Sequence, residues 1–383
     1  MVSCPPAVFC PPASPPRPRG ATLLAAGAVL ALVLSGCGGG RGSRQTIGVY
    51  SARHYNTDKE LYRRFTAQTG ISVNLLEGKD NALIERLRSE GSQSPADVLV
   101  LVDAARLVRA REQGLFQPIR SAALERDVPT NLRDPDGQWF GLTRRVRLVV
   151  VNPSLVPPGA VRRYADLAGP ALRGQLCLRD SRSVYNQSLV ADQLIQRGEA
   201  ATTAWVKGMV ANLRQPLFTS DIPLARAVAK GDCGAALVNS YYVARMVSGA
   251  NGAEDRELAA KLKVVFPEPA HVNLSGAGVT RHSRKAEAAT RLIEFLASPQ
   301  GGRGYAEANN EYPLRGFGEN PILRRFGPFR DDGVSARELG ENNKAAVALR
   351  AANPPRGSRA RPQRPTTRTL RTARPESRGR ERG

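Results

Sequence analysis

Histidine is scarce in this sequence, and the motifs of the common enzyme classes are missing. The only three histidines, His54, His271 and His282, are too scattered along the chain to form a zinc motif. The chain also lacks a Gly-x-Ser-x-Gly elbow, a Walker loop and a His-Glu-x-x-His helix. We therefore expect a protein that is not an enzyme.

Acidic residues are also few relative to basic ones. The 383 residues include 34 Asp and Glu against 56 Lys and Arg, a formal net charge of +22. Residues 351–383 hold ten Arg and two Glu, whereas in the body of the chain Arg alternates with acidic residues along predicted helices, as on solvated faces. We therefore expect no specific nucleic-acid partner. Because residues 351–383 have almost no apolar side chains, we expect a disordered tail there.

The N-terminus has the plan of an export signal. Arg17 and Arg19 precede the apolar run 21–34, which is shorter than the about 20 residues that a membrane helix needs. The Leu-Ser-Gly-Cys segment that follows resembles the bacterial lipobox, which implies cleavage before Cys37 and attachment of lipid to it. We expect residues 1–36 to be a signal peptide with a lipobox, and an uncleaved anchor is the alternative. Both place the protein outside the cytoplasm, as a lipid-anchored periplasmic protein in the first case.

Two of the five cysteines remain once the leader and the lipidated residue are set aside. These two, Cys177 and Cys233, would lie in an oxidising compartment, which favours a disulfide between them. Each lies in a short apolar, strand-like run, so two buried free thiols are the alternative. Their spacing does not fit a Cys-x-x-Cys metal site.

The body of the chain alternates predicted strands and helices, which indicates an α/β fold with parallel strands and helices on both faces. The first block has predicted strands at 46–51, 71–76 and 97–102 and helices at 57–69, 80–90 and 103–112. The second has strands at 147–152, 175–178 and 233–238 and helices at 186–197, 200–213 and 221–230; a strand at 273–280 and a helix at 284–297 follow. We expect lobe 1 at 46–145 with a return segment at about 272–312, and lobe 2 at 146–271 with about 313–350.

Four of the nine tyrosines lie in loops after predicted strands, where ligands of open α/β sheets bind. They are Tyr55, Tyr185, Tyr241 and Tyr242. An isolated tyrosine usually packs in a core, but the tandem pair is harder to explain in this way. Because a phenol has a pKa near 10, a phenol cluster is useful at neutral pH only when a cation deprotonates it, as a hard trivalent ion does. His54 is a candidate nitrogen ligand, although a lone loop histidine is more often solvated.

Six segments together resemble a known family. They are Ser-x-Arg-His-Tyr at 51–55, Ser-Pro-Ala-Asp-Val at 94–98, Tyr-Asn-Gln-Ser-Leu-Val-Ala at 185–191, Ala-Leu-Val-Asn-Ser-Tyr-Tyr at 236–242, Ser-Gly-Ala-Gly-Val at 275–279 and Glu-Tyr-Pro-Leu at 311–314. The chain resembles the ferric-iron-binding proteins of bacterial ABC importers, within the extracellular solute-binding proteins, and is most similar to their cyanobacterial branch. This resemblance implies a two-lobed periplasmic-binding-protein fold of class II type, with a ligand cleft between lobes joined by a hinge.

The resemblance also implies a site. Its iron ligands would be Tyr55, Tyr185, Tyr241 and Tyr242, with His54 as a candidate fifth ligand. Arg145 and Arg245 match arginines of the family that bond to the iron's ligands and not to the iron itself. Their positive charge would offset the negative charge of an extra phenolate. Because the chain is rich in Arg, the alternative is that Arg145 and Arg245 are ordinary surface residues with no part in the site.

The implied function is transport. The protein would carry Fe³⁺ as a transported ligand to an ABC permease and its ATPase subunit, as a monomer held at the membrane through Cys37. The alternative is the same fold binding a small anion through Arg53, Arg145 and Arg245.

Overall fold

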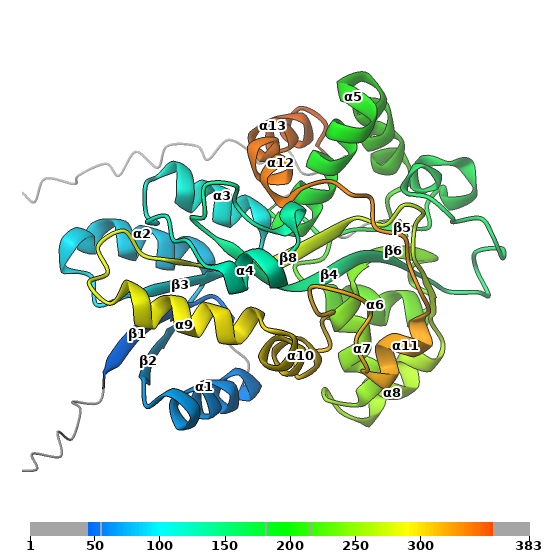
Figure 1. The fold of residues 1–383 in the computed structure, drawn as a ribbon. Coiled ribbons are helices and arrows are strands. Elements are labelled where there is room, and N and C mark those ends of the chain that lie inside the picture. The colour runs from blue at the N-terminus through cyan, green and yellow to red at the C-terminus, as the bar shows by residue number, and fades with distance from the viewer. Residues whose placement is uncertain (1–44, 54–55, 181, 215–216, 355–383) are drawn as a thin grey trace, which may run out of the picture. The chain divides into compact units, whose positions relative to one another are not determined.

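The computed structural model describes residues 45–53, 56–180, 182–214 and 217–354 (Figure 1). The predicted signal peptide, Cys37 and the candidate ligands His54 and Tyr55 lie outside these residues, as does the tail from residue 355 on. Among the described helices, none is both long enough and apolar enough to cross a membrane.

The first half of the chain alternates strand and helix as predicted. β1 (Thr46–Ser51) pairs in parallel with β2 (Ser72–Glu77) on one side and with β3 (Val98–Leu101) on the other. The helices of this half are α1 (Asn56–Thr69), α2 (Asp80–Glu90), α3 (Ala104–Glu112) and the short α4 (Ala122–Asp127). Gly70 ends α1 with φ 72°, a left-handed conformation that glycine adopts without steric cost.

β4 (Phe140–Val151) is shared by both halves of the sheet. Up to residue 146 it pairs antiparallel with β8 (Val272–Val279), and from residue 147 on it pairs antiparallel with β6 (Ala235–Asn239). β7 (Lys263–Val265) also pairs with the second part of β4, and the strand order is β2-β1-β3-β8-β4-β6-β5. The prediction of parallel strands is therefore right at the two ends of the sheet and wrong at its centre, where β4 and β8 run antiparallel to their neighbours.

The second half contains a shorter α/β unit. β5 (Leu176–Cys177) pairs in parallel with β6, and the predicted disulfide between Cys177 and Cys233 is present. The helices are α5 (Val184–Asn212), α6 (Asp221–Lys230), α7 (Ser240–Ser248) and α8 (Ala253–Ala260). The two helices predicted between residues 186 and 213 are joined in α5, with a break at Gly198, whose φ is 76°.

The remaining helices return to both halves. α9 (Ala286–Ala297) and α10 (Pro299–Glu307) pack against the first half, and α11 (Pro321–Phe326) packs on α7. α12 (Ala336–Glu341) contacts both α3 and α5, so part of the segment expected in lobe 2 also contacts the first half (Figure 1). α13 (Asn343–Ala352) packs on α5 and ends beyond residue 351, where the tail was predicted to begin.

Both faces of the central strands are buried. In β3, Val98 and Val100 pack into one apolar cluster with α1 and α9, whereas Leu99 and Leu101 pack into another with α2 and α3. This alternation follows from the two-residue period of a strand. The helices thus cover the sheet faces and leave the ends of the strands for polar side chains.

Candidate functional site

A cavity of about 180 Å³ lies where residues from both halves of the chain meet. Phenol, guanidinium, ammonium and carboxyl groups make up most of its lining. The lining residues are Ala52, Arg53, Lys79, Asp80, Val102, Arg145, Tyr185, Tyr241, Tyr242 and Glu311. The cavity therefore contains the three predicted tyrosines that the structure describes, together with one of the two predicted arginines.

The three tyrosines are close to one another. The Tyr241 hydroxyl donates to the Tyr185 hydroxyl over 3.3 Å, and the ring centroids of Tyr241 and Tyr242 are 4.2 Å apart. Tyr241 is 2% exposed, while the other two are half-buried. The contact between Tyr185 and Tyr241 could not be read from the sequence, because most of α5 and all of α6 lie between the two residues.

These tyrosines lie on the first turns of helices and not in loops, which corrects the prediction. Tyr185 is the second residue of α5, and Tyr241 and Tyr242 are the second and third residues of α7. The unpaired N–H groups of a first helical turn carry partial positive charge, which favours a negative group nearby. Two such helix N-termini lie at this cavity.

Arg145 lines the same cavity as the tyrosines, and several hydrogen bonds fix its guanidinium. It donates to the Leu274 carbonyl over 2.6 Å and to Ser275 Oγ over 3.0 Å, and it also bonds the Val102 carbonyl. Its Cζ is 5.5 Å from the centre of the Tyr185 ring. Burial alone would lower the pKa of Arg145, but neighbouring Tyr185 and acidic groups raise it overall, so the cation persists inside the protein.

A second buried arginine, Arg147, joins the parts that carry the tyrosines. Its guanidinium donates to Asp221 over 2.8 Å, to Asn186 next to Tyr185 over 2.7 Å, and to Asn239 at the end of β6 over 3.2 Å. Asp221 also accepts from the Asn239 backbone N–H over 3.0 Å. This network holds the start of α5 against the start of α7.

Arg147 and Arg179 are site residues that sequence reasoning missed. Their Cζ atoms lie 5.9 and 5.4 Å from the centre of the Tyr185 ring. A signal existed for both, because Arg147 is two residues from Arg145 and Arg179 directly follows a predicted strand. The predicted Arg245 lies on α7 and is not among the described residues that line the cavity.

Glu311 lines the cavity and is bonded to Arg53, the residue before His54. Arg53, which is fully buried, donates to Glu311 and, through Nε, to Asp58 of α1 over 3.0 Å. Thr143 of β4 donates to the same Glu311 oxygen over 2.7 Å. The end of β1 is thereby fixed at Arg53.

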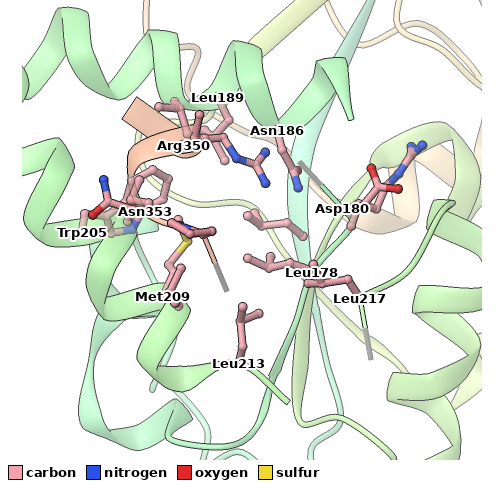
Figure 2. Close-up of a pocket in the computed structure, with 17 residues that line it drawn as sticks. Leu178, Asp180, Asn186, Leu189, Trp205, Met209, Leu213, Leu217, Arg350 and Asn353 are labelled. Atoms are coloured by element: carbon pink, nitrogen blue, oxygen red, sulfur yellow. The ribbon is translucent and has the colours of Figure 1, made fainter. Parts of the chain in front are cut away.

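A larger cavity, of about 260 Å³, lies between α5, α13 and β5 and has a different chemistry. Figure 2 shows Trp205 and Met209 of α5, Leu213 just after that helix, and Leu178 lining it, while Arg350 is one of its few charged groups. Burial lowers the pKa of Arg350 to about 10. None of its described lining residues is shared with the tyrosine cavity, and its apolar walls do not suit a small hard cation.

Residues 93–325, more than half of the chain, match the family described as bacterial extracellular solute-binding protein. The chain belongs to this family. Iron uptake protein A1 of Synechocystis is 44% identical over 304 residues, which cover 78% of this chain and 84% of that protein. The Fe(3+)-binding periplasmic protein of Serratia marcescens is 31% identical, over 80% of this chain and 89% of its own.

A solved structure extends the likeness to three dimensions. The Trichodesmium protein IdiA (FutA), in complex with iron and citrate ligands, has a TM-score of 0.78 and 40% sequence identity, covering 81% of this chain and 99% of that one. The two-lobed α/β fold expected from the sequence is thus confirmed, as is the expected family. These relatives are named as uptake and binding proteins, not as enzymes.

Proposed function

We propose that this protein is the ferric-iron-binding component of a bacterial ABC importer and that it holds Fe³⁺ through a cluster of tyrosines. The ligands are Tyr185, Tyr241 and Tyr242 together with Tyr55, and His54 is the candidate fifth ligand. The observation that carries the proposal is the contact between the Tyr241 and Tyr185 hydroxyls in a cavity that Tyr242 also lines. The names of the Synechocystis and Serratia relatives support ferric iron as the ligand.

Charge balance supports the same assignment. Three phenolates offset the charge of Fe³⁺, and a fourth leaves an excess negative charge in a partly buried place. Arg145, Arg147 and Arg179 surround the Tyr185 ring and offset that excess. The buried, fixed guanidiniums of Arg145 and Arg147 would do this without moving when the ion binds.

The alternative of a small anion held by Arg53, Arg145 and Arg245 fits less well. Arg53 and Arg145 are both buried and already donate to carboxylates, hydroxyls or carbonyls of the protein. An anion would have to displace these acceptors. Arg245 does not line the cavity among the described residues.

Export and delivery complete the proposal. The leader and Cys37 predict a periplasmic protein anchored through lipid, and the partners are a permease and its ATPase subunit in the membrane. Solute-binding proteins of this fold class close around their ligand by hinge motion, which is how a monomer presents a closed, loaded form to a permease.

The visible spectrum of the ferric-loaded protein tests the function. We expect a red to orange colour from charge transfer between phenolate and Fe³⁺, which the same protein loaded with a colourless anion lacks. A competition titration with a ferric chelator then gives the affinity. A protein that remains colourless after ferric loading and dialysis would refute the tyrosine site.

Deletion of residues 355–383 tests whether the basic tail has a part in this function. These residues carry a net charge of +8 but few apolar side chains, so we expect ferric affinity and melting temperature to stay nearly unchanged. Weak binding to polyanions should disappear and, in the full-length protein, should be screened by ordinary salt. Full-length protein that selects one DNA sequence at physiological salt, or a truncation that abolishes ferric loading, would contradict this expectation.

A further inference from the structure

Three ionisable side chains meet at a second buried place, outside the tyrosine cavity. Asp192 lies on α5, His271 directly precedes β8, and Asp332 lies in the segment between α11 and α12. One potential ligand atom from each lies within 4.8 Å of the other two. Their side chains are 0, 2 and 1% exposed. The cluster shares no residue with the described lining of the tyrosine cavity.

The groups are close, but His271 makes no hydrogen bond to either carboxyl group. His271 Nδ1 is 3.9 Å from Asp192 Oδ1 and 3.6 Å from Asp332 Oδ2, both too long for hydrogen bonds. Among the described residues, neither ring nitrogen of His271 has a hydrogen-bond partner, nor does Asp332 Oδ2. Leaving a buried polar atom unpaired costs about 1–3 kcal/mol, so the unpaired His271 Nδ1 and Asp332 Oδ2, which lie 3.6 Å apart, indicate a missing partner between them.

The spacing suits a metal ion. A point equidistant from three atoms spaced in this way lies roughly 2–2.5 Å from each of them, which is the range of metal–nitrogen and metal–oxygen bonds. One imidazole and two carboxylates are a donor set that divalent first-row metals accept, zinc among them. A fourth coordination position would remain for water.

The surroundings orient the carboxylates toward that point. Gln193 and Gln196 donate to the two oxygens of Asp192 over 2.9 and 2.8 Å. The Val334 backbone N–H donates to Asp332 Oδ1 over 2.9 Å, which leaves Oδ2 for another partner. Such outer contacts are the usual means by which a protein fixes its metal ligands.

Charge leads to the same conclusion. Two ionised carboxylates in a buried place need a counter-charge. A divalent cation would neutralise both carboxylates at once.

We propose that Asp192, His271 and Asp332 bind a divalent transition-metal ion of the zinc class, at a structural site separate from the ferric cargo site. The ion joins α5, the start of β8 and the segment that leads into α12. That helix contacts both halves of the chain, so the ion stabilises the region where the halves connect. Gly333, the residue after Asp332, is exposed and has open space where a Cβ would lie, so this segment faces solvent.

Metal analysis of ferric-loaded protein tests the proposal, since iron then blocks the tyrosine cavity against other ions. The full chain is incubated with Zn²⁺, dialysed, and analysed for zinc and iron per chain. We expect one zinc per chain in the wild type and at least about a tenfold loss of zinc affinity in Asp192→Asn and Asp332→Asn, with the ferric colour retained. Asp331→Asn is the matched control, because it makes the same change of charge one residue away and Asp331 lies outside the cluster.

Thermal melting separates loss of the site from loss of the fold. Zinc should raise the melting temperature of the wild type and of Asp331→Asn, and it should leave that of Asp332→Asn unchanged. The ferric colour of each variant shows that it is folded. Wild-type protein that retains no Zn²⁺, or zinc binding that survives both Asp192→Asn and Asp332→Asn, would overturn the proposal.

Discussion

Tyr241→Phe and Tyr242→Phe are each expected to lower the affinity for Fe³⁺ by more than about 100-fold. Loss of an outer contact to a metal ligand typically costs about 10–100-fold, and these substitutions remove a ligand oxygen itself. The aromatic ring remains, so the packing of α7 is preserved and the fold should be unaffected. Competition with a ferric chelator gives the affinity, and the visible spectrum shows whether phenolate charge transfer weakens in parallel.

Tyr62→Phe is the matched control for these variants. Tyr62 lies on α1, is 4% exposed, and does not line the tyrosine cavity. The substitution also removes one phenolic oxygen, so any general effect of a tyrosine-to-phenylalanine change would show in it. Wild-type ferric affinity in both Tyr241→Phe and Tyr242→Phe would end the proposed metal site.

Removal of the Cys177–Cys233 disulfide should have the largest effect on stability. The bond closes a loop with a sequence separation of 56 that contains α5 and α6, and both cysteines are 1% exposed. A cross-link over a loop of this length stabilises the folded state by about 4 kcal/mol in the chain-entropy model. We therefore expect the free energy of unfolding of Cys177→Ala/Cys233→Ala, measured in urea, to fall by about 2–4 kcal/mol.

Reduction of the wild-type protein provides an independent check on this value. In the presence of reductant, the unfolding midpoint of the wild type should move toward that of the double variant. The unfolding midpoint of the double variant should not change. Intact-mass analysis after alkylation without reductant should find neither cysteine modified in folded, exported protein. Equal unfolding midpoints for wild type and double variant would contradict the stabilising role.

The strands and helices of the first half could be predicted because their sequence patterns are local. β1 and the helix 80–90 have the predicted bounds, since apolar periodicity and a terminating glycine suffice to place them. The first part of β4 was missed. Residues 144 and 145 are arginines, which indicates a polar, exposed segment until their partners elsewhere in the chain are known.

The tyrosines could be selected from the sequence because they follow strands, and three of them do share one cavity. The arginines around Tyr185 were only partly found, because burial of a guanidinium depends on acceptors such as Asp221 that lie far away in sequence. The same holds for the cluster at His271. Scattered histidines exclude a zinc motif by spacing, but the fold can still bring one histidine to two distant carboxylates.

The shared strand β4 has a mechanical consequence. Arg145 and Arg147 are two residues apart, so they lie on the same face of β4, yet Arg145 is bonded to the first half and Arg147 to the second. Relative rotation of the halves therefore strains the few peptide units between the β8-paired and β6-paired parts of this strand. Opening of the cavity would therefore change the distance between Tyr185, which α5 carries, and Arg145, which stays bonded to β8.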